Sequence, residues 1–317
     1  MLFRRARSRV VPPAEIDVVV PGGAMGAMYT LAGVALVREL ECAGVARVRA
    51  YYATSAGSLI AVCALCYAKD ELIARTLDFV LLLQERARTH WIHETIAAHL
   101  HDTLPVDAHT RCTGRLVLST TRLARHARET VAAFESRDAL IDAVVDSCRL
   151  PFFSAPARCV LGRHDGYLSP TPPTERAARA SPPADGARAD GARAVTVTLP
   201  YPPAWETVAL SLRVVWWATP FMPATDVHAR ARAALAAGVD LAVPRVALAV
   251  DVPPAVVART RAAIERAHAT RDDDERRGGL LLAVWRLVRR LARKLRARLL
   301  RGASALTKLE LRPRRRA

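Results

Sequence analysis

The chain has 317 residues, 51% of them hydrophobic, and this apolar content excludes a wholly disordered protein and allows a large core. No apolar run reaches the ~18 residues that a membrane-spanning helix requires, and the basic N-terminus lacks an apolar stretch of signal-peptide length. We therefore expect an intracellular, cytoplasmic protein that is not secreted and has no transmembrane helix. The six cysteines are scattered along the chain, which favours free thiols in a reducing compartment.

The net charge of +17 is concentrated at the two ends of the chain. Residues 1–14 carry four arginines and no acid, and residues 278–317 carry eleven arginines and two lysines against one acid, so residues 15–277 are almost neutral. Any electrostatic partner is therefore expected to bind the terminal segments. We predict a basic N-terminal arm (1–14), one domain (15–270) and a C-terminal segment (271–317) made of an acidic linker and a basic tail.

The first part of the domain alternates between strand-like and helix-like patterns. This alternation is typical of a parallel α/β sheet in which the helices are the crossovers between strands. A glycine-rich loop, Pro21–Gly26, lies between the first strand and the first helix, and Gly44 is well placed to end that helix. The predicted elements are strands at 15–20 and 48–52 and helices at 27–43 and 59–68.

The elements of the rest of the chain are spaced less regularly. Ser136 precedes a helical pattern and is a predicted N-cap, and Gly238 is expected to interrupt a later helix. Residues 174–194 are of low complexity and are predicted to form a flexible surface insert. The further predicted elements are helices at 69–88, 91–101, 136–145 and 229–242, and strands at 115–121, 195–199 and 210–217.

The segment Ala53–Ser58 lies between the second predicted strand and the buried helix that follows it. A serine between small residues on a strand-to-helix turn is typical of a nucleophile elbow, because the tight turn leaves the hydroxyl exposed at the end of the strand. The start of the helix also directs N–H groups toward an anion formed there. Gly57 fits the usual pattern G-x-S-x-G, whereas Ala53 replaces its first glycine. We interpret Ser55 as a candidate nucleophile.

Two groups of residues could in principle bind a metal. Four histidines, at positions 90, 93, 99 and 101, lie in predicted helices, but without the spacing of a known zinc motif. Cys63 and Cys66 form a C-x-x-C inside the apolar helix, and no second pair follows at zinc-site spacing. We interpret the histidines as solvent-exposed and the cysteines as buried structural residues, and we expect no metal and no cofactor.

Acyl transfer requires a nucleophile, a base that activates it and hydrogen-bond donors for the oxyanion. Ser55 is the candidate nucleophile. The backbone N–H groups of Gly22, Gly23 and Ala24 are candidate oxyanion donors, because bare glycine backbone at a strand end can approach a substrate closely. Asp165, which precedes Gly166 in a predicted turn, is the candidate base, provided that it reaches Ser55 and that burial raises its pKa.

Three segments, Gly22–Ala27 with its Gly26, Ala53–Ser58 and Asp165–Gly166, resemble the ordered signatures of patatin-like phospholipases. Residues 134–141 and 147–153 resemble the approach to the catalytic aspartate in the adiponutrin and adipose triglyceride lipase branch of that family. The resemblance implies a three-layer α/β domain with a central, mostly parallel sheet. It also implies a Ser–Asp dyad without a catalytic histidine, an oxyanion hole formed by the glycine loop, and a lipid ester as substrate.

Several positions depart from the family pattern. Pro21 lacks an N–H group where the loop often has a glycine, and Met25 stands where many relatives have Lys or Arg. Ala53 replaces the first glycine of the elbow, Tyr167 replaces the second glycine of the usual D-G-G, and Thr171 replaces the nearby asparagine. These departures leave open a second hypothesis, in which the chain is a catalytically weak or inactive protein that binds lipid surfaces or acts as a scaffold.

Residues 280–301 of the tail have a helical period, with apolar side chains, among them Trp285, near one stripe and arginines and lysines on the rest. A basic amphipathic C-terminal helix of this kind suits an anionic membrane or a lipid-droplet surface, and we expect peripheral association there. The alternative is that the helix packs its apolar stripe on the parent domain. Binding to nucleic acid is disfavoured, because the tail carries one aromatic residue and no recognisable reading motif.

Overall fold

A computed structural model describes residues 12–23, 26–86, 92–125, 127–150, 162–168, 195–199 and 224–269. The chain divides into two compact units, residues 1–265 and 266–317, and the description below concerns the first. Several predicted features lie outside the described residues: Ala24 and Met25 of the glycine loop, the insert 174–194, the strand 210–217, the linker 271–279 and the tail helix 280–301. None of the described helices combines the length and the apolar character needed to cross a membrane.

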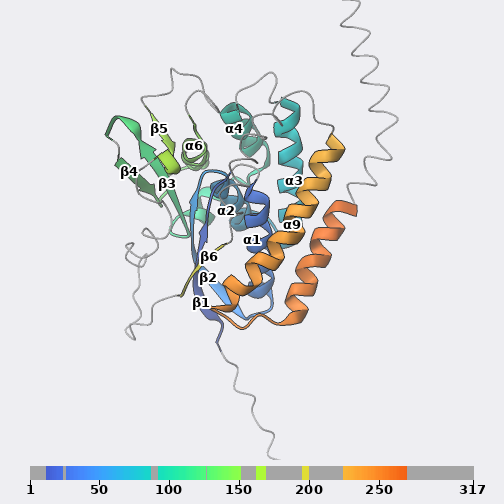
Figure 1. Cartoon of the computed structure of the whole chain (residues 1–317). Helices are drawn as coiled ribbons and strands as arrows, with labels where there is room; N and C mark the ends of the chain where they lie inside the picture. The colour runs from blue at the N-terminus through green and yellow to red at the C-terminus, as the bar shows by residue number, and fades with distance from the viewer. Residues whose placement is uncertain are drawn as a thin grey trace, which may run out of the picture. The chain divides into compact units, whose positions relative to one another are not determined.

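The sheet has six strands in the order β4-β3-β2-β1-β6, and β5 pairs with β3 off this path (Figure 1). The pairs β1–β2, β1–β6 and β2–β3 are parallel, whereas β4 and β5 are antiparallel to β3. The predicted α/β class with a mostly parallel central sheet is confirmed. The strands are β1 (Ala14–Val20), β2 (Ala46–Thr54), β3 (Leu116–Arg122), β4 (Ala127–Val131), β5 (Arg163–Asp165) and β6 (Val195–Thr198).

Seven α-helices and two short 3-10 helices have defined bounds in the described part of the chain, and residues 254–269 form a further helix. The predicted cap of α6 is confirmed, because Ser136 Oγ accepts a hydrogen bond from the N–H of Ala139 at 3.1 Å. The helices are α1 (Ala27–Cys42), α2 (Ala56–Cys66), α3 (Lys69–Arg86), α4 (Ile92–Thr103), α5 (Ala108–Cys112), α6 (Arg137–Ser147), α9 (Ala224–Ala247), η2 (Leu123–Arg125) and η4 (Gly166–Leu168).

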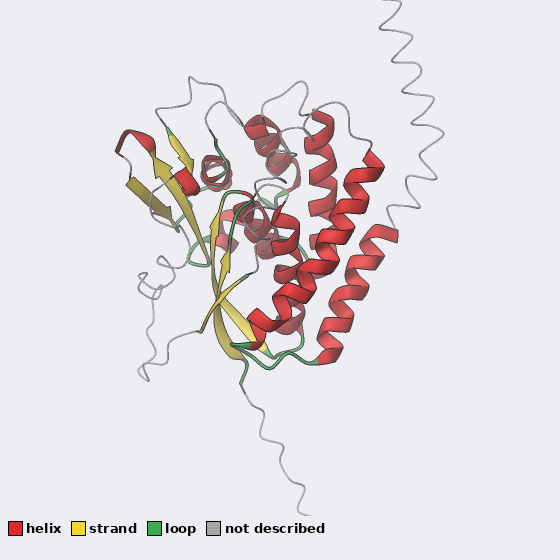
Figure 2. Ribbon diagram, in the orientation of Figure 1, coloured by secondary structure: helices red, strands yellow, loops and turns green. Residues whose placement is uncertain are grey.

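The helices pack against the sheet in layers (Figure 2). The chain steps from β1 to β2 to β3 in one direction across the sheet, and right-handed crossovers therefore place α1 and α2 on the same face. α1 contacts β2 and α2, and α9 packs on α1 as an outer layer. Because α1 lies between the sheet and α9, it is buried along nearly its whole circumference, including polar Thr30 and Glu39.

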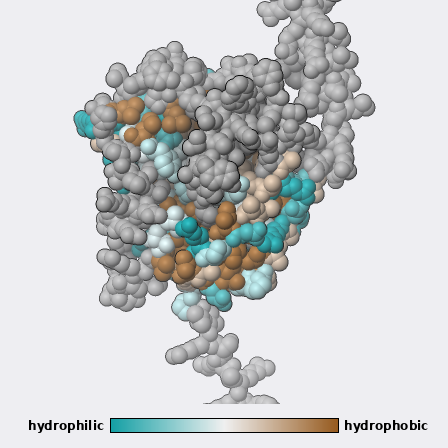
Figure 3. All heavy atoms as spheres, viewed as in Figure 1, coloured by the Kyte–Doolittle hydropathy of each residue, from teal (hydrophilic) through white to brown (hydrophobic). Residues whose placement is uncertain are grey.

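Polar and weakly apolar residues are mixed at the right-hand edge of Figure 3, and the exposed residues of the helical segment 254–265 are arginine, glutamate, alanine and proline. Val256, Thr260 and Ile264 are buried at a spacing of four residues, which is the apolar stripe of a surface helix. Arg259 bonds to the buried Glu39 of α1 at 3.2 Å, and the same carboxylate accepts a bond from Lys69 at 2.8 Å. This pairing compensates for the burial of Glu39 and connects α1 with α3 and the last helix.

The prediction that Gly238 interrupts its helix is wrong, because α9 continues through this position. A Cβ atom at Gly238 would lie 2.7 Å from the carbonyl oxygen of Tyr29 and 2.8 Å from the Cβ of Ala32, both in α1. The glycine therefore allows the two helix backbones to approach each other, and it does not act as a helix breaker. Helix–helix contacts of this kind are not encoded in the local sequence pattern.

We predict that Gly238→Ala destabilises the protein by roughly 1–3 kcal/mol, because the added methyl group would separate α9 from α1. Helix propensity alone predicts the opposite, a gain of about 1 kcal/mol. Chemical denaturation followed by circular dichroism measures the change. Ala236 is exposed in the same helix, so Ala236→Gly serves as a control that measures the intrinsic difference in helix propensity between alanine and glycine. A Gly238→Ala variant more stable than the wild type would contradict the packing argument.

Candidate active site

Two strands meet end to end along one edge of β3. β2 pairs with the first half of β3, where Thr54 lies opposite Ser119, and β5 pairs with the second half, where Asp165 lies opposite Thr120. β4 occupies the other edge of β3 along residues 118–122. β2 and β5 must therefore share the remaining edge, and because they run in opposite directions their carboxyl ends face each other. The ends of open parallel sheets are where such folds commonly place their sites.

Ser55 follows β2 directly and has a strained backbone, with φ 55° and ψ −136°. It has the sole positive φ among the non-glycine residues that the structure describes, and α2 begins at the next residue. A Cβ atom at Gly57 would lie 2.3 Å from the carbonyl oxygen of Val20 and 2.6 Å from that of Pro21, so that only glycine fits. The sharp strand-to-helix turn is thus held against the end of β1.

Asp165, the last residue of β5, is buried and lies against Ser55. The Ser55 side chain interacts with its carboxylate and lowers its pKa, and the N–H of Tyr167 donates to Oδ1 at 2.9 Å. Both interactions favour the ionised form, but burial outweighs them and raises the pKa of Asp165 to about 6. The structure therefore brings together the two side chains that the sequence selected as candidate nucleophile and candidate base.

The glycine-rich loop lies beside Ser55. A Cβ atom at Gly22 would lie 2.4 Å from the Cβ of Ser55 and 2.8 Å from the carbonyl oxygen of Thr54, so the loop backbone is as close to the elbow as a chain can come. Gly23 has φ 137°, and its carbonyl oxygen accepts a bond from the N–H of Gly26 at 2.8 Å. Gly22 and Gly23 therefore lie beside Ser55, the position that a loop donating hydrogen bonds to an oxyanion would need to occupy.

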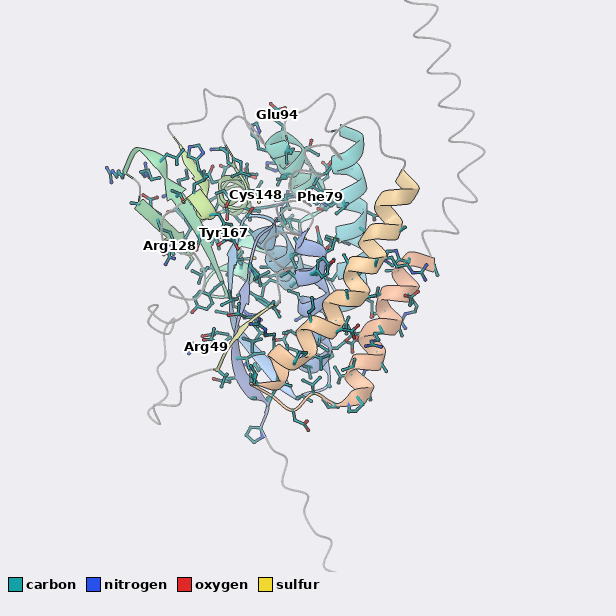
Figure 4. All side chains as sticks on the ribbon, viewed as in Figure 1. Arg49, Phe79, Glu94, Arg128, Cys148 and Tyr167 are labelled. Atoms are coloured by element: carbon teal, nitrogen blue, oxygen red, sulfur yellow. The ribbon has the colours of Figure 1, made fainter. Side chains whose placement is uncertain are left out.

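The residues that follow Asp165 close one side of the site. Gly166 fits where a Cβ atom would lie 2.8 Å from the carbonyl oxygen of Ser119. Tyr167 is 46% exposed, and its ring approaches Gly22, where an added Cβ would lie 2.9 Å from Cε2. Tyr167 therefore connects the aspartate turn to the glycine loop. Tyr167 and Cys148 are labelled in Figure 4.

The structure adds two residues that were not candidates in the sequence, Ser147 and Cys148 at the end of α6. Ser147 Oγ accepts a bond from the N–H of Ser55 at 3.1 Å, and the Cys148 thiol donates to the carbonyl oxygen of Ser55 at 3.1 Å. Ser147 is completely buried. The sequence signal that could have identified Ser147 was a hydroxyl at the apolar end of a helix, because a buried polar group needs a hydrogen-bond partner.

The candidate metal ligands of the sequence lie in other surroundings. Cys63 and Cys66 are buried free thiols, as predicted. His99 stacks on Phe79 with ring centroids 4.6 Å apart, and His101 faces Asp138. Within the described residues, no three His, Cys, Asp or Glu side chains are grouped so that they could hold a metal ion.

Part of the chain is similar to a known protein. The chain is 30% identical over 115 residues to the mouse protein 1-acylglycerol-3-phosphate O-acyltransferase Pnpla3, a patatin-like protein. The matched part is 33% of this chain and 27% of the mouse protein, so the chain spans about a quarter of the length of its curated relative. No family model matches the chain. The similarity agrees with the resemblance of the motifs and points in general to a patatin-like, lipid-modifying enzyme.

We predict that Asp165→Asn makes the protein more stable at pH 8. Burial raises the pKa of Asp165 from its ordinary 3.8 to about 6, so the folded state disfavours the ionised carboxyl, and wild-type stability falls as the pH rises from 3.8 through 6. The asparagine avoids this cost, which is at most about 3 kcal/mol. The thermal midpoint, measured at pH 5 and pH 8, should favour the variant by a wider margin at pH 8.

Asp142→Asn serves as the control, because Asp142 is exposed on α6, and its effect on the midpoint should be small and should not grow with pH. An Asp165→Asn variant whose advantage stays constant or shrinks between pH 5 and pH 8 would contradict the burial of an ionisable carboxyl at this position.

Proposed function

We propose that this protein is a lipid acyl-ester hydrolase of the patatin-like type, in which Ser55 is the nucleophile and Asp165 is the general base. The observation that carries the proposal is the placement of Ser55 beside the buried carboxylate of Asp165, since β2 and β5 end opposite adjacent residues of β3 and the two side chains interact. Nucleophile and base within hydrogen-bond reach are the requirement for activating a weakly nucleophilic hydroxyl. The partial similarity to a patatin-like protein supports the same assignment.

In the first step, Ser55 Oγ attacks the ester carbonyl carbon while Asp165 accepts the hydroxyl proton. The tetrahedral intermediate then collapses, the bond to the leaving alcohol breaks, and Asp165 returns the proton to that alcohol. In the second step, Asp165 takes a proton from a water molecule that attacks the acyl carbonyl carbon. The bond to Ser55 Oγ then breaks, Asp165 returns the proton to Ser55 Oγ, and the fatty acid is released. A pKa of about 6 suits this role, because the carboxyl is mostly ionised at neutral pH and is a stronger base than an ordinary aspartate.

The oxyanion of the intermediate requires donors fixed in advance. We assign this role to the backbone N–H groups of Gly22, Gly23 and Ala24. The support is the close approach of Gly22 to Ser55 and the position of the loop at the end of β1. Loss of one such donor typically costs about 3–4 kcal/mol of transition-state stabilisation.

A second candidate reaction is acyl transfer, which the name of the mouse relative favours. The acyl-enzyme at Ser55 is common to both reactions. In transfer, the free hydroxyl of a lysophospholipid takes the place of water, so that one ester bond breaks and another forms. The two reactions differ only in the acceptor that reaches the acyl-enzyme.

The rival hypothesis of a catalytically inactive scaffold does not explain the backbone of Ser55. A positive φ at a serine costs of order 1–3 kcal/mol and is typically retained at functional sites. A scaffold could relieve this strain with glycine at position 55. The strained turn therefore favours the enzyme over the scaffold.

We also propose that residues 280–301 bring the protein to an anionic membrane or lipid-droplet surface from the cytoplasmic side. The basis is the sequence pattern of apolar and basic residues. A peripheral location would place the enzyme next to an insoluble substrate.

We predict that Ser55→Ala abolishes release of fatty acid from mixed phospholipid and triacylglycerol substrates, because the nucleophile is lost while the fold is kept. A drop of at least about 10⁴-fold is expected for loss of a catalytic nucleophile. Released fatty acid and newly acylated lysophosphatidic acid are both measured, with and without this acceptor, so that hydrolysis and transfer are both detected. A wild-type protein that catalyses neither reaction, or a variant that remains as active, would refute the proposal.

We predict that kcat/KM rises with pH and reaches half of its plateau near pH 6. The base must be ionised to accept the proton, and the folded pKa of Asp165 is about 6, so activity is lost as the pH falls through 6. Initial rates on a soluble nitrophenyl ester between pH 4.5 and pH 8 give the profile. A midpoint near 4, or a flat profile, would exclude Asp165 as a base with a raised pKa.

We predict that replacing four arginines of the tail with glutamine weakens binding to vesicles on the order of 100-fold or more at low salt, since each basic residue contributes about 1 kcal/mol. Sedimentation with phosphatidylcholine vesicles, with and without phosphatidylserine, measures the binding of the full chain. The matched control replaces the four arginines of residues 1–14. Equal effects of both variants, or tighter binding to duplex DNA than to vesicles, would contradict the proposal. The tail positions are Arg286, Arg289, Arg290 and Arg293.

A further inference from the structure

We propose that residues Ser147–Arg149, here called the α6 clamp, set the relative position of Ser55 and Asp165 and are therefore positioning residues of the reaction. The expected effect of these residues on kcat rests on the proposed function. The link itself is structural, because three consecutive residues bond to the main chain of both candidate catalytic residues.

Ser147 holds the N–H of Ser55. Its hydroxyl accepts this bond at 3.1 Å and donates to the carbonyl oxygen of Ser119 in β3 at 2.9 Å. It also lies 2.9 Å from Ser58 Oγ, at the start of α2. One buried hydroxyl therefore connects the elbow to the neighbouring strand and to the following helix.

Cys148 holds the opposite side of Ser55. Its thiol donates to the carbonyl oxygen of Ser55 at 3.1 Å. Burial, together with the nearby charge of Asp165, raises the pKa of this thiol, so it stays protonated and remains a donor. Both main-chain polar groups of the strained residue are thus bonded to adjacent side chains of one turn.

Arg149 holds the aspartate. Its carbonyl oxygen accepts a bond from the N–H of Asp165 at 2.9 Å, and its guanidinium pairs with Asp146 in α6 at 2.7 Å. β2 and β5 are not paired with each other, and within the sheet they are joined only through β3. The α6 clamp adds a second link, because it bonds to the main chain of both Ser55 and Asp165.

The test compares Ser147→Ala with Ser58→Ala on a soluble nitrophenyl ester. Ser147→Ala removes the bond to Ser55, and kcat should fall on the order of 100-fold, the cost of a small misplacement of reacting groups. KM and the pH midpoint should not change, because the hydroxyl is buried and its hydrogen bonds are to Ser55, Ser119 and Ser58. Ser58 is equally buried in the same network, but Ser58→Ala leaves Ser147 bonded to Ser55 and should keep most of the activity.

A rescue variant and a second readout separate positioning from folding. Ser147→Cys retains a weak donor and acceptor of similar size, and its kcat should lie between those of the wild type and Ser147→Ala. Hydrogen exchange measured by mass spectrometry should show faster exchange of the peptide over residues 53–58 in Ser147→Ala, and not in Ser58→Ala. This readout does not require any enzymatic activity.

The outcomes distinguish this inference from the proposed function. If Ser55→Ala is inactive while Ser147→Ala retains wild-type kcat and wild-type exchange, the clamp is refuted and the proposed reaction stands. If the wild type has no activity, the proposed reaction fails, and the exchange result alone decides whether the clamp holds the elbow. Equal losses of kcat in Ser147→Ala and Ser58→Ala would mean that the buried hydroxyls serve folding only.

Discussion

The close contact between the ends of β1 and β2 is the constraint on which the candidate site depends. Gly22 and Gly57 allow this contact, since a side chain at either position would meet main-chain atoms less than 3 Å away. The contact forces the chain to turn sharply after Thr54, and Ser55 takes a positive φ as a result. The strain is compensated by buried bonds from the end of α6. A costly turn at a single serine is therefore built into the α/β core.

The position of Asp165 follows from the arrangement of the strands around β3. β2 ends just before α2 begins, and β5 pairs with the next residues along the same edge of β3, in the opposite direction to β2. The carboxyl end of β2 therefore faces the carboxyl end of β5, although the two strands are far apart in sequence. This arrangement buries the carboxylate and raises its pKa toward neutrality. We propose that this buried carboxylate, which interacts with the Ser55 side chain, acts as the base without a histidine.

Features encoded locally could be predicted from the sequence, and those that depend on packing could not. The apolar runs of β1 and β2, the cap at Ser136 and the ordered motifs around Ser55 and Asp165 were visible as patterns. β4 was missed because this edge strand is only partly buried and lacks an alternating apolar pattern, and α5 was missed because it has five residues. Gly238 was misread because its contact with α1 is not local. The α6 clamp was missed for the same reason, since its bonds join distant segments.

The central claim is that Asp165 activates Ser55 as a nucleophile. A fluorophosphonate probe reacts with activated serines and forms a covalent adduct that intact-protein and peptide mass spectrometry can locate. We expect one adduct per chain, on Ser55, whose formation is strongly slowed in Asp165→Asn although that variant remains folded. Absence of labelling in the folded wild type, or labelling of Ser55 at the same rate in Asp165→Asn, would contradict it.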